Sequence, residues 1–180
     1  MTLRFRAGTA ADTDAVVALV ESAYRGDASR VGWTTEADLL DGRRTGADDI
    51  AAILARPRSR LLLADLPSTG SGQAWELVAC AHVAEEDGAG YFGMFSVQPG
   101  LQNSGIGKAM LAEAERIARD EWKLPTMRMT VIDVRDALIA WYERRGYRRT
   151  GKHKPFPYGD ARFGIPKRGD LRFEILEKAF

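Results

Sequence analysis

The fold is decided by the stretch Val97-Gln98-Pro99-Gly100-Leu101-Gln102-Asn103-Ser104-Gly105-Ile106-Gly107-Lys108-Ala109-Met110-Leu111. The segment before it, Tyr91–Val97, is rich in aromatic and apolar residues, which predicts a strand. After it, apolar residues recur at helical spacing, at Leu111, Ala114, Ile117 and Ala118. The stretch is therefore a glycine-containing turn between a strand and a helix. The free N–H groups and positive dipole end of a helix N-terminus suit a phosphate.

Three residues of this turn favour a bound phosphate, and the turn can be compared with the sequence patterns of two common phosphate-binding loops. Ser104 is a candidate helix cap, and Gly105 and Gly107 let a ligand approach the backbone closely. A Walker A loop would need glycine at Gln102 and serine or threonine at Ala109, and it fails at both. A dinucleotide fingerprint would need a third glycine where Met110 stands. An ordinary tight turn before a helix remains the alternative.

The pattern Gln-x-x-Gly-x-Gly over Gln102–Gly107, preceded by Val97-x-Pro99, resembles the pyrophosphate-binding motif of the GNAT family of N-acetyltransferases. The resemblance implies an α/β fold, with a mixed central sheet of about seven strands flanked by helices on both faces. It implies acetyl-CoA as co-substrate and no metal. It assigns the pyrophosphate to Gln102, Asn103, Ser104, Gly105, Ile106, Gly107 and Lys108, and the pantetheine amides to the backbone of Ser96 and Val97.

Composition describes an ordinary globular protein. The 180 residues fit one domain, predicted to span 1–180, and the net charge of +1 does not favour nucleic-acid binding. The single cysteine excludes an internal disulfide, and no apolar run is long enough to cross a membrane. The chain begins without a hydrophobic signal region. We therefore expect a cytoplasmic protein with no membrane partner. GNAT-like proteins are often dimers, so a homodimer is an open expectation.

The rest of the chain gives the predicted order β-α-α-β-β-β-α-β-α-β-β, which is the order expected of the GNAT fold. A short helix is also expected from Thr34 or Thr35 to Gly42, and 67–74 and 154–169 are predicted loops. Predicted strands cover 3–7, 60–65, 76–85, 91–97, 125–132, 147–151 and 171–176, and longer helices cover 10–24, 48–56, 105–118 and 137–145.

A second motif, Leu138–Tyr147, resembles the family pattern of a tyrosine on the last helix followed by Gly-aromatic. In the family that tyrosine lies near the CoA sulfur and is often proposed as the general acid, which implies this role for Tyr142. A core aromatic is the alternative for Tyr142. Many members carry Asn seven residues earlier, whereas this chain has Arg135. Arg135 is therefore an expected cofactor contact or simply a residue at the helix start.

The acceptor site is less defined by the sequence. By the resemblance, Tyr24, Trp33 and Thr34 are candidate substrate-binding residues; for Trp33 and Thr34 the alternatives are a core anchor and a helix cap. Four residues of the late loop, three of them aromatic, are candidates for an acceptor wall. Those late-loop candidates are Phe156, Tyr158, Asp160 and Phe163.

The general base cannot be identified from the sequence. Cys80 would permit an acetyl-cysteine intermediate, but no neighbouring motif supports it, and a small buried thiol is the alternative. A basic run over 144–154 is either a site for the CoA 3′-phosphate or an acidic acceptor, or a solvated helix end. Candidates for the base, each with a structural alternative, are His82, Glu85, Glu86, Asp87 and Asp133.

Together these features predict an N-acetyltransferase that moves an acetyl group from acetyl-CoA to a primary amine by direct attack in a ternary complex. The acceptor is a small molecule, a peptide or a protein. The alternative is an acyl-CoA-binding sensor or regulatory module on the same fold, without turnover. A nucleotide-phosphate enzyme is disfavoured by the missing Walker residues.

Overall fold

The protein is described from a computed structural model, which describes residues 2–69 and 74–180. Its elements in chain order are β1 (Arg4–Ala7), η1 (Ala10–Asp12), α1 (Thr13–Tyr24), η2 (Asp27–Val31), β2 (Leu40–Asp41), α2 (Ala47–Ala55), β3 (Ser59–Pro67), β4 (Trp75–Glu86), β5 (Ala89–Val97), η3 (Pro99–Leu101), α3 (Ile106–Arg116), η4 (Ile117–Glu121), β6 (Thr126–Ile132), α4 (Asp136–Glu143), β7 (Arg148–Pro155), η5 (Ala161–Phe163), β8 (Ile165–Pro166) and β9 (Arg172–Ala179).

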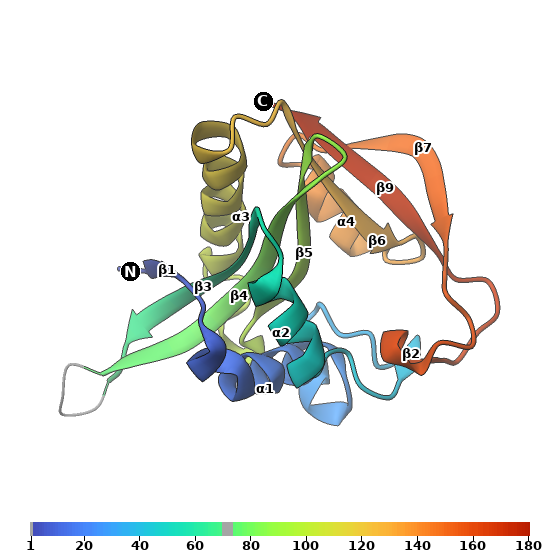
Figure 1. The fold of residues 1–180 in the computed structure, drawn as a ribbon. Coiled ribbons are helices and arrows are strands. Elements are labelled where there is room, and N and C mark those ends of the chain that lie inside the picture. Colours follow the sequence, from blue (N-terminus) through green and yellow to red (C-terminus); the bar gives the residue numbers. More distant parts are fainter. Residues whose placement is uncertain (1, 70–73) are drawn as a thin grey trace.

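The described strands form a seven-stranded mixed sheet in the order β1-β3-β4-β5-β6-β9-β7, which confirms the predicted fold class (Figure 1). Neighbouring strands are antiparallel except β5 and β6, which run parallel as the helical crossover through α3 predicts. The β5–β6 ladder contains only the pairs Gly90–Met127 and Tyr91–Arg128. Beyond these pairs the two strands diverge, and the sheet opens at its centre.

Helices cover both faces of the sheet because each presents an apolar stripe to it. Val16, Leu19 and Val20 of α1 and Ile50 of α2 are buried in one cluster with Cys80 of β4. A larger cluster on the other face joins α3 and α4 to the strands. Its helical members include Ile106, Met110, Leu111, Ala114, Leu138, Ile139 and Tyr142.

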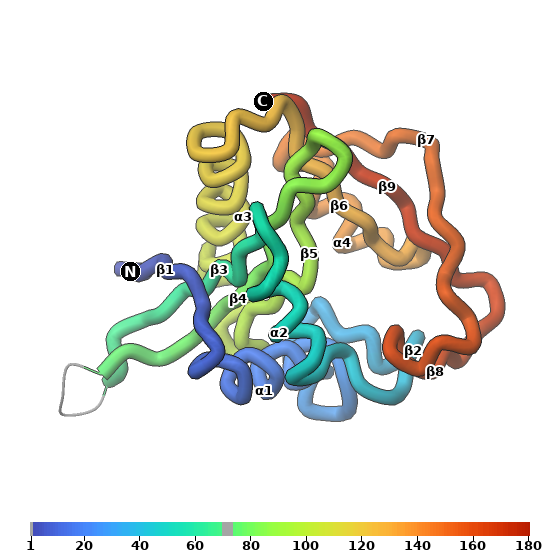
Figure 2. Tube along the Cα trace, viewed as in Figure 1, coloured from blue at the N-terminus to red at the C-terminus, as the bar shows by residue number. Residues whose placement is uncertain are grey.

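The helix predicted between Thr34 and Gly42 is wrong. The Thr35 hydroxyl accepts a hydrogen bond from the Ala37 N–H at 3.1 Å, so the segment forms a turn instead. The chain then enters β2, which pairs with β8 from the distant C-terminal region in a separate two-stranded sheet (Figure 2). The predicted loop 154–169 is therefore partly structured, since β7 extends into it and it contains η5 and β8.

The predicted hairpin loop 67–74 is shorter in the structure, because β3 extends to Pro67 and β4 begins at Trp75. Its centre, 70–73, lies outside the described residues. Across the described parts of the chain, no helix is long and apolar enough for a membrane crossing.

Candidate functional site

The turn before α3 has the backbone geometry that a glycine-rich anion site requires. Gly105 is the helix N-cap with φ +91°, and Asn103 also has a positive φ of +68°. The Cβ direction of Gly105 points into open space. The predicted capping role of Ser104 is wrong, because its hydroxyl donates to the Leu101 carbonyl at 2.5 Å instead of accepting from the helix.

Several backbone N–H groups at the start of α3 have no hydrogen-bond acceptor among the described residues. Within the described part of the chain, none of the N–H groups from Asn103 to Lys108 donates to a backbone or side-chain acceptor, and the first bond of the series is Ala109 N–H to the Gly105 carbonyl at 3.1 Å. These donors sit at the positive end of the α3 dipole. The sequence-predicted pyrophosphate loop is thus an open row of donors suited to an anion.

A cavity of about 340 Å³ lies against this row of donors. Gly107 lies beside this cavity, and a Cβ there would be 3.2 Å from the Phe95 ring, close enough that the ring would have to shift by a few tenths of an ångström. The guanidinium carbon of Arg145 lies 3.5 Å above the Trp141 ring at the same cavity. The cavity is lined by Trp33, Thr34, Phe95, Val97, Gln102, Asn103, Gly105, Gly107, Lys108, Trp141 and Arg145.

Gln102 joins the cavity to the segment after η2. Its side-chain oxygen accepts from the Trp33 N–H at 2.9 Å, and its amide nitrogen donates to the Thr34 hydroxyl at 2.8 Å and the Val97 carbonyl at 3.3 Å. Trp33 is 38% exposed and no helix starts at Thr34, so the alternatives of core anchor and helix cap are wrong. The predicted acceptor residues Trp33 and Thr34 therefore line the same cavity as the glycine turn.

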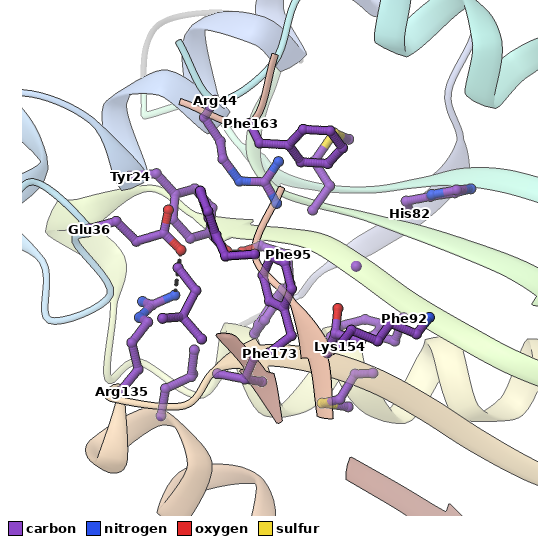
Figure 3. Close-up of a pocket in the computed structure, with 18 of the residues that line it drawn as sticks. Tyr24, Glu36, Arg44, His82, Phe92, Phe95, Arg135, Lys154, Phe163 and Phe173 are labelled. Carbon is purple, nitrogen blue, oxygen red and sulfur yellow. Dashed lines mark hydrogen bonds and ion pairs between the residues drawn. The ribbon is translucent and has the colours of Figure 1, made fainter. Parts of the chain in front are cut away.

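A larger cavity of about 520 Å³ lies at the opening between β5 and β6 (Figure 3). It is lined from α1, the 36–44 segment, the central strands and the late loop, and Phe95 lines both cavities. Ser96 lines neither: it is 2% exposed and pairs with Cys80 in the β4–β5 ladder. Phe95 thus borders both cavities.

Two predicted tyrosines face the larger cavity. The Tyr24 hydroxyl donates to the Phe95 carbonyl, and burial raises the pKa of Tyr24 despite the nearby charges of Arg135 and Arg44. Tyr142 is 4% exposed, and among the described residues its hydroxyl has no hydrogen-bond partner. Burial strongly raises the Tyr142 pKa, so the phenol keeps its proton at neutral pH.

Arg135 belongs to a buried charge cluster beside Tyr24 in the larger cavity, and the structure does not bring it to the glycine turn. It donates to Glu36 at 2.9 Å and to the Thr34 carbonyl at 2.5 Å, and Arg25 donates to the other Glu36 oxygen at 2.6 Å (Figure 3 shows the Arg135–Glu36 pair). Burial alone would raise the Glu36 pKa, but the charges of the neighbouring arginines outweigh the effect of burial, so the pKa is lowered. Glu36 could not be singled out from the sequence, because its partner Arg135 lies 99 residues further along the chain.

Cys80 and His82 are both neutral in this environment. Burial raises the pKa of the Cys80 thiol to about 12, and the side chain is 0% exposed, which supports the buried-thiol alternative. His82 lines the larger cavity, with its Nε2 hydrogen-bonded to the Ser59 hydroxyl at 2.8 Å. Burial, reinforced by the charge of Arg56, lowers the His82 pKa to about 4.

Most of the remaining candidate bases are turn residues or ion-pair partners. Glu86 lines the larger cavity and pairs with Arg56 at 3.0 Å, whereas Asp133 pairs with Arg172 at 2.6 Å. Asp87 is exposed at a turn with φ +50°. Glu85 pairs with Arg58 at the same end of the sheet.

Some residues of the basic run and of the late loop line one of the two cavities, and others form ion pairs or hydrogen bonds within the fold. Arg145 lines the smaller cavity and Lys154 the larger one, whereas His153 pairs with Glu174 at 2.9 Å. Of the predicted acceptor wall, Phe156 and Phe163 line the larger cavity. Tyr158 instead donates to the Arg168 carbonyl, and Asp160 holds Arg162.

The comparisons with known proteins agree with this geometry. Residues 43–147, more than half of the chain, match the model of the Acetyltransferase (GNAT) family. The chain therefore belongs to the GNAT family of acetyltransferases, whose typical co-substrate is acetyl-CoA. No curated protein sequence matches the chain.

Several solved structures share the fold. The ribosomal-protein-alanine N-acetyltransferase from Brucella melitensis is 19% identical, with a TM-score of 0.67 over 98% of this chain and 99% of that one. The ribosomal-protein-S18-alanine N-acetyltransferase from Escherichia coli is 15% identical, with a TM-score of 0.65 over 99% and 94%. A Bacillus anthracis str. Ames protein solved in complex with acetyl coenzyme A is 15% identical, with a TM-score of 0.56 over 72% and 67%.

Proposed function

We propose that this protein transfers an acetyl group from acetyl-CoA to a primary amine. The observation that carries the proposal is the row of free N–H donors from Asn103 to Lys108 at the start of α3. A diphosphate is the group that such a row binds well, because several oxygens accept at once and the helix dipole favours their charge. Lys108 and Arg145 add positive charge at the same cavity.

The proposed binding site follows from the open edge of β5. Val97 lines the smaller cavity at the end of the strand, where the divergence of β6 leaves backbone groups free for strand-like pairing. We expect the pantetheine amides to pair along this edge, which would bring the thioester to Phe95. The full set of proposed cofactor contacts is Ser96, Val97, Gln102, Asn103, Ser104, Gly105, Ile106, Gly107, Lys108 and Arg135. The position of Arg135 in the larger cavity favours a role near the acetyl end.

Acetyl-CoA supplies an activated acyl group, so the protein has to orient an amine and return a proton. We expect the larger cavity to bring the acceptor to Phe95, because this residue lines both cavities. The Tyr142 phenol holds a proton with no competing partner among the described residues, which suits donation to a departing thiolate. The inaccessibility of Cys80 supports direct attack by the amine in a ternary complex. Tyr24, Trp33 and Thr34 are the proposed acceptor-side residues.

The test is a pair of glycine substitutions. Gly105 and Gly88 both have positive φ and open space around the Cβ position, at +91° and +75°. Valine at either site strains the backbone similarly. Only Gly105→Val fills the space beside the free donors, so we expect a loss of acetyl-CoA affinity of at least about tenfold, measured by calorimetry, while Gly88→Val binds normally.

The activity itself is tested by release of free coenzyme A with a panel of amines. Equal acetyl-CoA affinity in both glycine variants would contradict the placement of the diphosphate. If acetyl-CoA binds but no amine of the panel causes release of coenzyme A, the proposed turnover is contradicted, and the result favours an acyl-CoA-binding module.

A further inference from the structure

The larger cavity contains a cation that the proposed reaction does not use. Arg44 lies between β2 and α2, is partly buried, and lines the cavity. Among the residues that the structure describes, no side chain or carbonyl forms a hydrogen bond or ion pair with its guanidinium. The guanidinium carbon of Arg44 lies 5.3 Å from the centroid of the Tyr24 ring. Figure 3 shows the Arg44 guanidinium directed into the cavity.

The surroundings keep this group charged and leave it without a counter-ion. Burial opposes the charge, but the combined fields of Glu36 and of the more weakly acting Tyr24, Tyr91 and Glu21 outweigh the cost of burial, so the pKa of Arg44 is raised. Glu36 is already bonded to Arg25 and Arg135, which leaves that cluster with an excess positive charge. Glu21 is also near, but its side chain accepts from the backbone N–H groups of Arg44 and Thr45.

The cavity as a whole is cationic. Four of its six charged lining residues are basic, and the acidic residue outside the Glu36 cluster, Glu86, pairs with Arg56. Lys154 also lines the cavity and, within the described residues, has no ion-pair partner. His82 adds no charge at neutral pH. A partly buried arginine with free N–H groups is best satisfied by an oxyanion, which can accept two parallel bonds.

The position of Arg44 also limits the size of the ligand. Tyr24 connects it to the point of transfer, because the ring lies beside Arg44 and the hydroxyl bonds to the Phe95 carbonyl. An amine at Phe95 and an anion at Arg44 are therefore separated by about one tyrosine side chain. Aromatic residues, including Phe156, Phe163 and Phe173, supply an apolar wall for the remainder of the molecule.

We propose, building on the proposed acetyl transfer, that the acceptor is a compact amino acid-like molecule whose oxyanion pairs with Arg44 while its amine lies at Phe95. The oxyanion is a carboxylate or a phosphonate. A polyamine or an amine without an acidic group lacks this partner. A peptide N-terminus lacks it as well, because its α-carboxylate has become an amide.

The experiment compares wild type with Arg44→Gln and Arg44→Lys, and uses Arg43→Gln as matched control. Arg43 is the neighbouring arginine, is exposed and lines neither cavity. The panel contains amino carboxylates, the corresponding aminophosphonates, the corresponding carboxamides and the decarboxylated amines. Coenzyme A release gives kcat and KM, and calorimetry gives the acetyl-CoA affinity of each variant.

We expect Arg44→Gln to raise KM for the preferred acid about 10- to 100-fold while acetyl-CoA affinity stays unchanged. The decisive quantity is the acid-to-carboxamide ratio of kcat/KM in wild type divided by that in Arg44→Gln. This double ratio cancels the different intrinsic reactivity of the two amines. Arg43→Gln should leave it unchanged, and Arg44→Lys should restore part of it. The carboxylate and phosphonate arms identify the oxyanion.

A double ratio near one overturns the inference, as does faster acetylation of amines without an acid, and both results leave the proposed acetyl transfer intact. If acetyl-CoA binds but no amine turns over, binding of the acids and carboxamides to the acetyl-CoA-loaded protein is measured directly. Absence of acid-selective, Arg44-dependent binding then overturns the inference. Loss of acetyl-CoA binding by the wild-type protein would contradict the proposed function instead.

Discussion

Tyr142 and Tyr147 lie in one aromatic cluster, and we expect Tyr142 to take part in catalysis and Tyr147 to stabilise the fold. Their rings pack edge to face with centroids 5.8 Å apart. The Tyr147 hydroxyl donates to Glu115 at 2.9 Å, whereas the Tyr142 hydroxyl faces the larger cavity. The Tyr147 hydroxyl is therefore engaged in a structural hydrogen bond, whereas Tyr142 remains the proposed proton donor.

Tyr142→Phe is expected to lower kcat about 100-fold, within the range typical of a lost general acid, with less than about a threefold change in acetyl-CoA affinity. Tyr147→Phe should instead reduce the free energy of unfolding by about 1–3 kcal/mol, because Glu115 loses a buried partner, and should leave kcat nearly unchanged. Steady-state kinetics and urea unfolding of both variants separate the roles. Parallel losses of kcat and affinity in Tyr142→Phe would indicate packing.

At the scale of elements, Gln102 connects the 32–34 segment to the end of β5. Gln102→Ala should free the Trp33 N–H and the Thr34 hydroxyl, with a loss of about 1–2 kcal/mol in the free energy of unfolding. Amide hydrogen exchange at Trp33 should become faster. Gln98→Ala is the matched control, because the Gln98 side chain makes no hydrogen bond within the described residues. Unchanged exchange at Trp33 would show that the segment is held by other contacts.

The strand, turn and helix around Gly105 could be predicted because their signals are local. Apolar alternation, two glycines and a helical stripe lie within about 30 consecutive residues, the usual span of such a unit. β2 and β8 could not be predicted, because each has two residues and exists only through pairing across the chain. Thr34 and Thr35 looked like helix caps, but tertiary pairing placed a turn and a strand there.

The larger cavity was the least predictable part of the site. Glu36, Arg44 and Arg135 come together in one cavity only because the fold brings the end of β6 and the 34–44 segment beside α1. Gln102 was predicted as a phosphate contact, and the structure adds a clamping role that sequence spacing cannot show. Arg145 was among the predicted basic residues, whereas Phe95 and Trp141 lay within the quoted segments without an assigned role, and closer attention to large side chains around the glycines would have singled them out.

At the scale of the whole molecule, the predicted single domain over 1–180 should unfold in one cooperative transition. The large cluster takes side chains from β3–β6, β9, α3 and α4, which couples both sides of the opening in the sheet. Acetyl-CoA at about 100 times its Kd should add about 2.7 kcal/mol to the free energy of unfolding and raise Tm by several degrees. Scanning calorimetry measures both. Two separated transitions would contradict a single domain.

Phe95 lines both cavities, and this has a kinetic consequence for the proposed ternary complex. In that complex acetyl-CoA occupies the smaller cavity and the amine the larger one, so either reactant binds without displacing the other. Initial velocities should therefore give intersecting double-reciprocal lines, and spent coenzyme A should compete with acetyl-CoA while leaving room for a fresh amine. In this proposal the molecule holds both reactants at once, and no product has to leave before the second reactant binds.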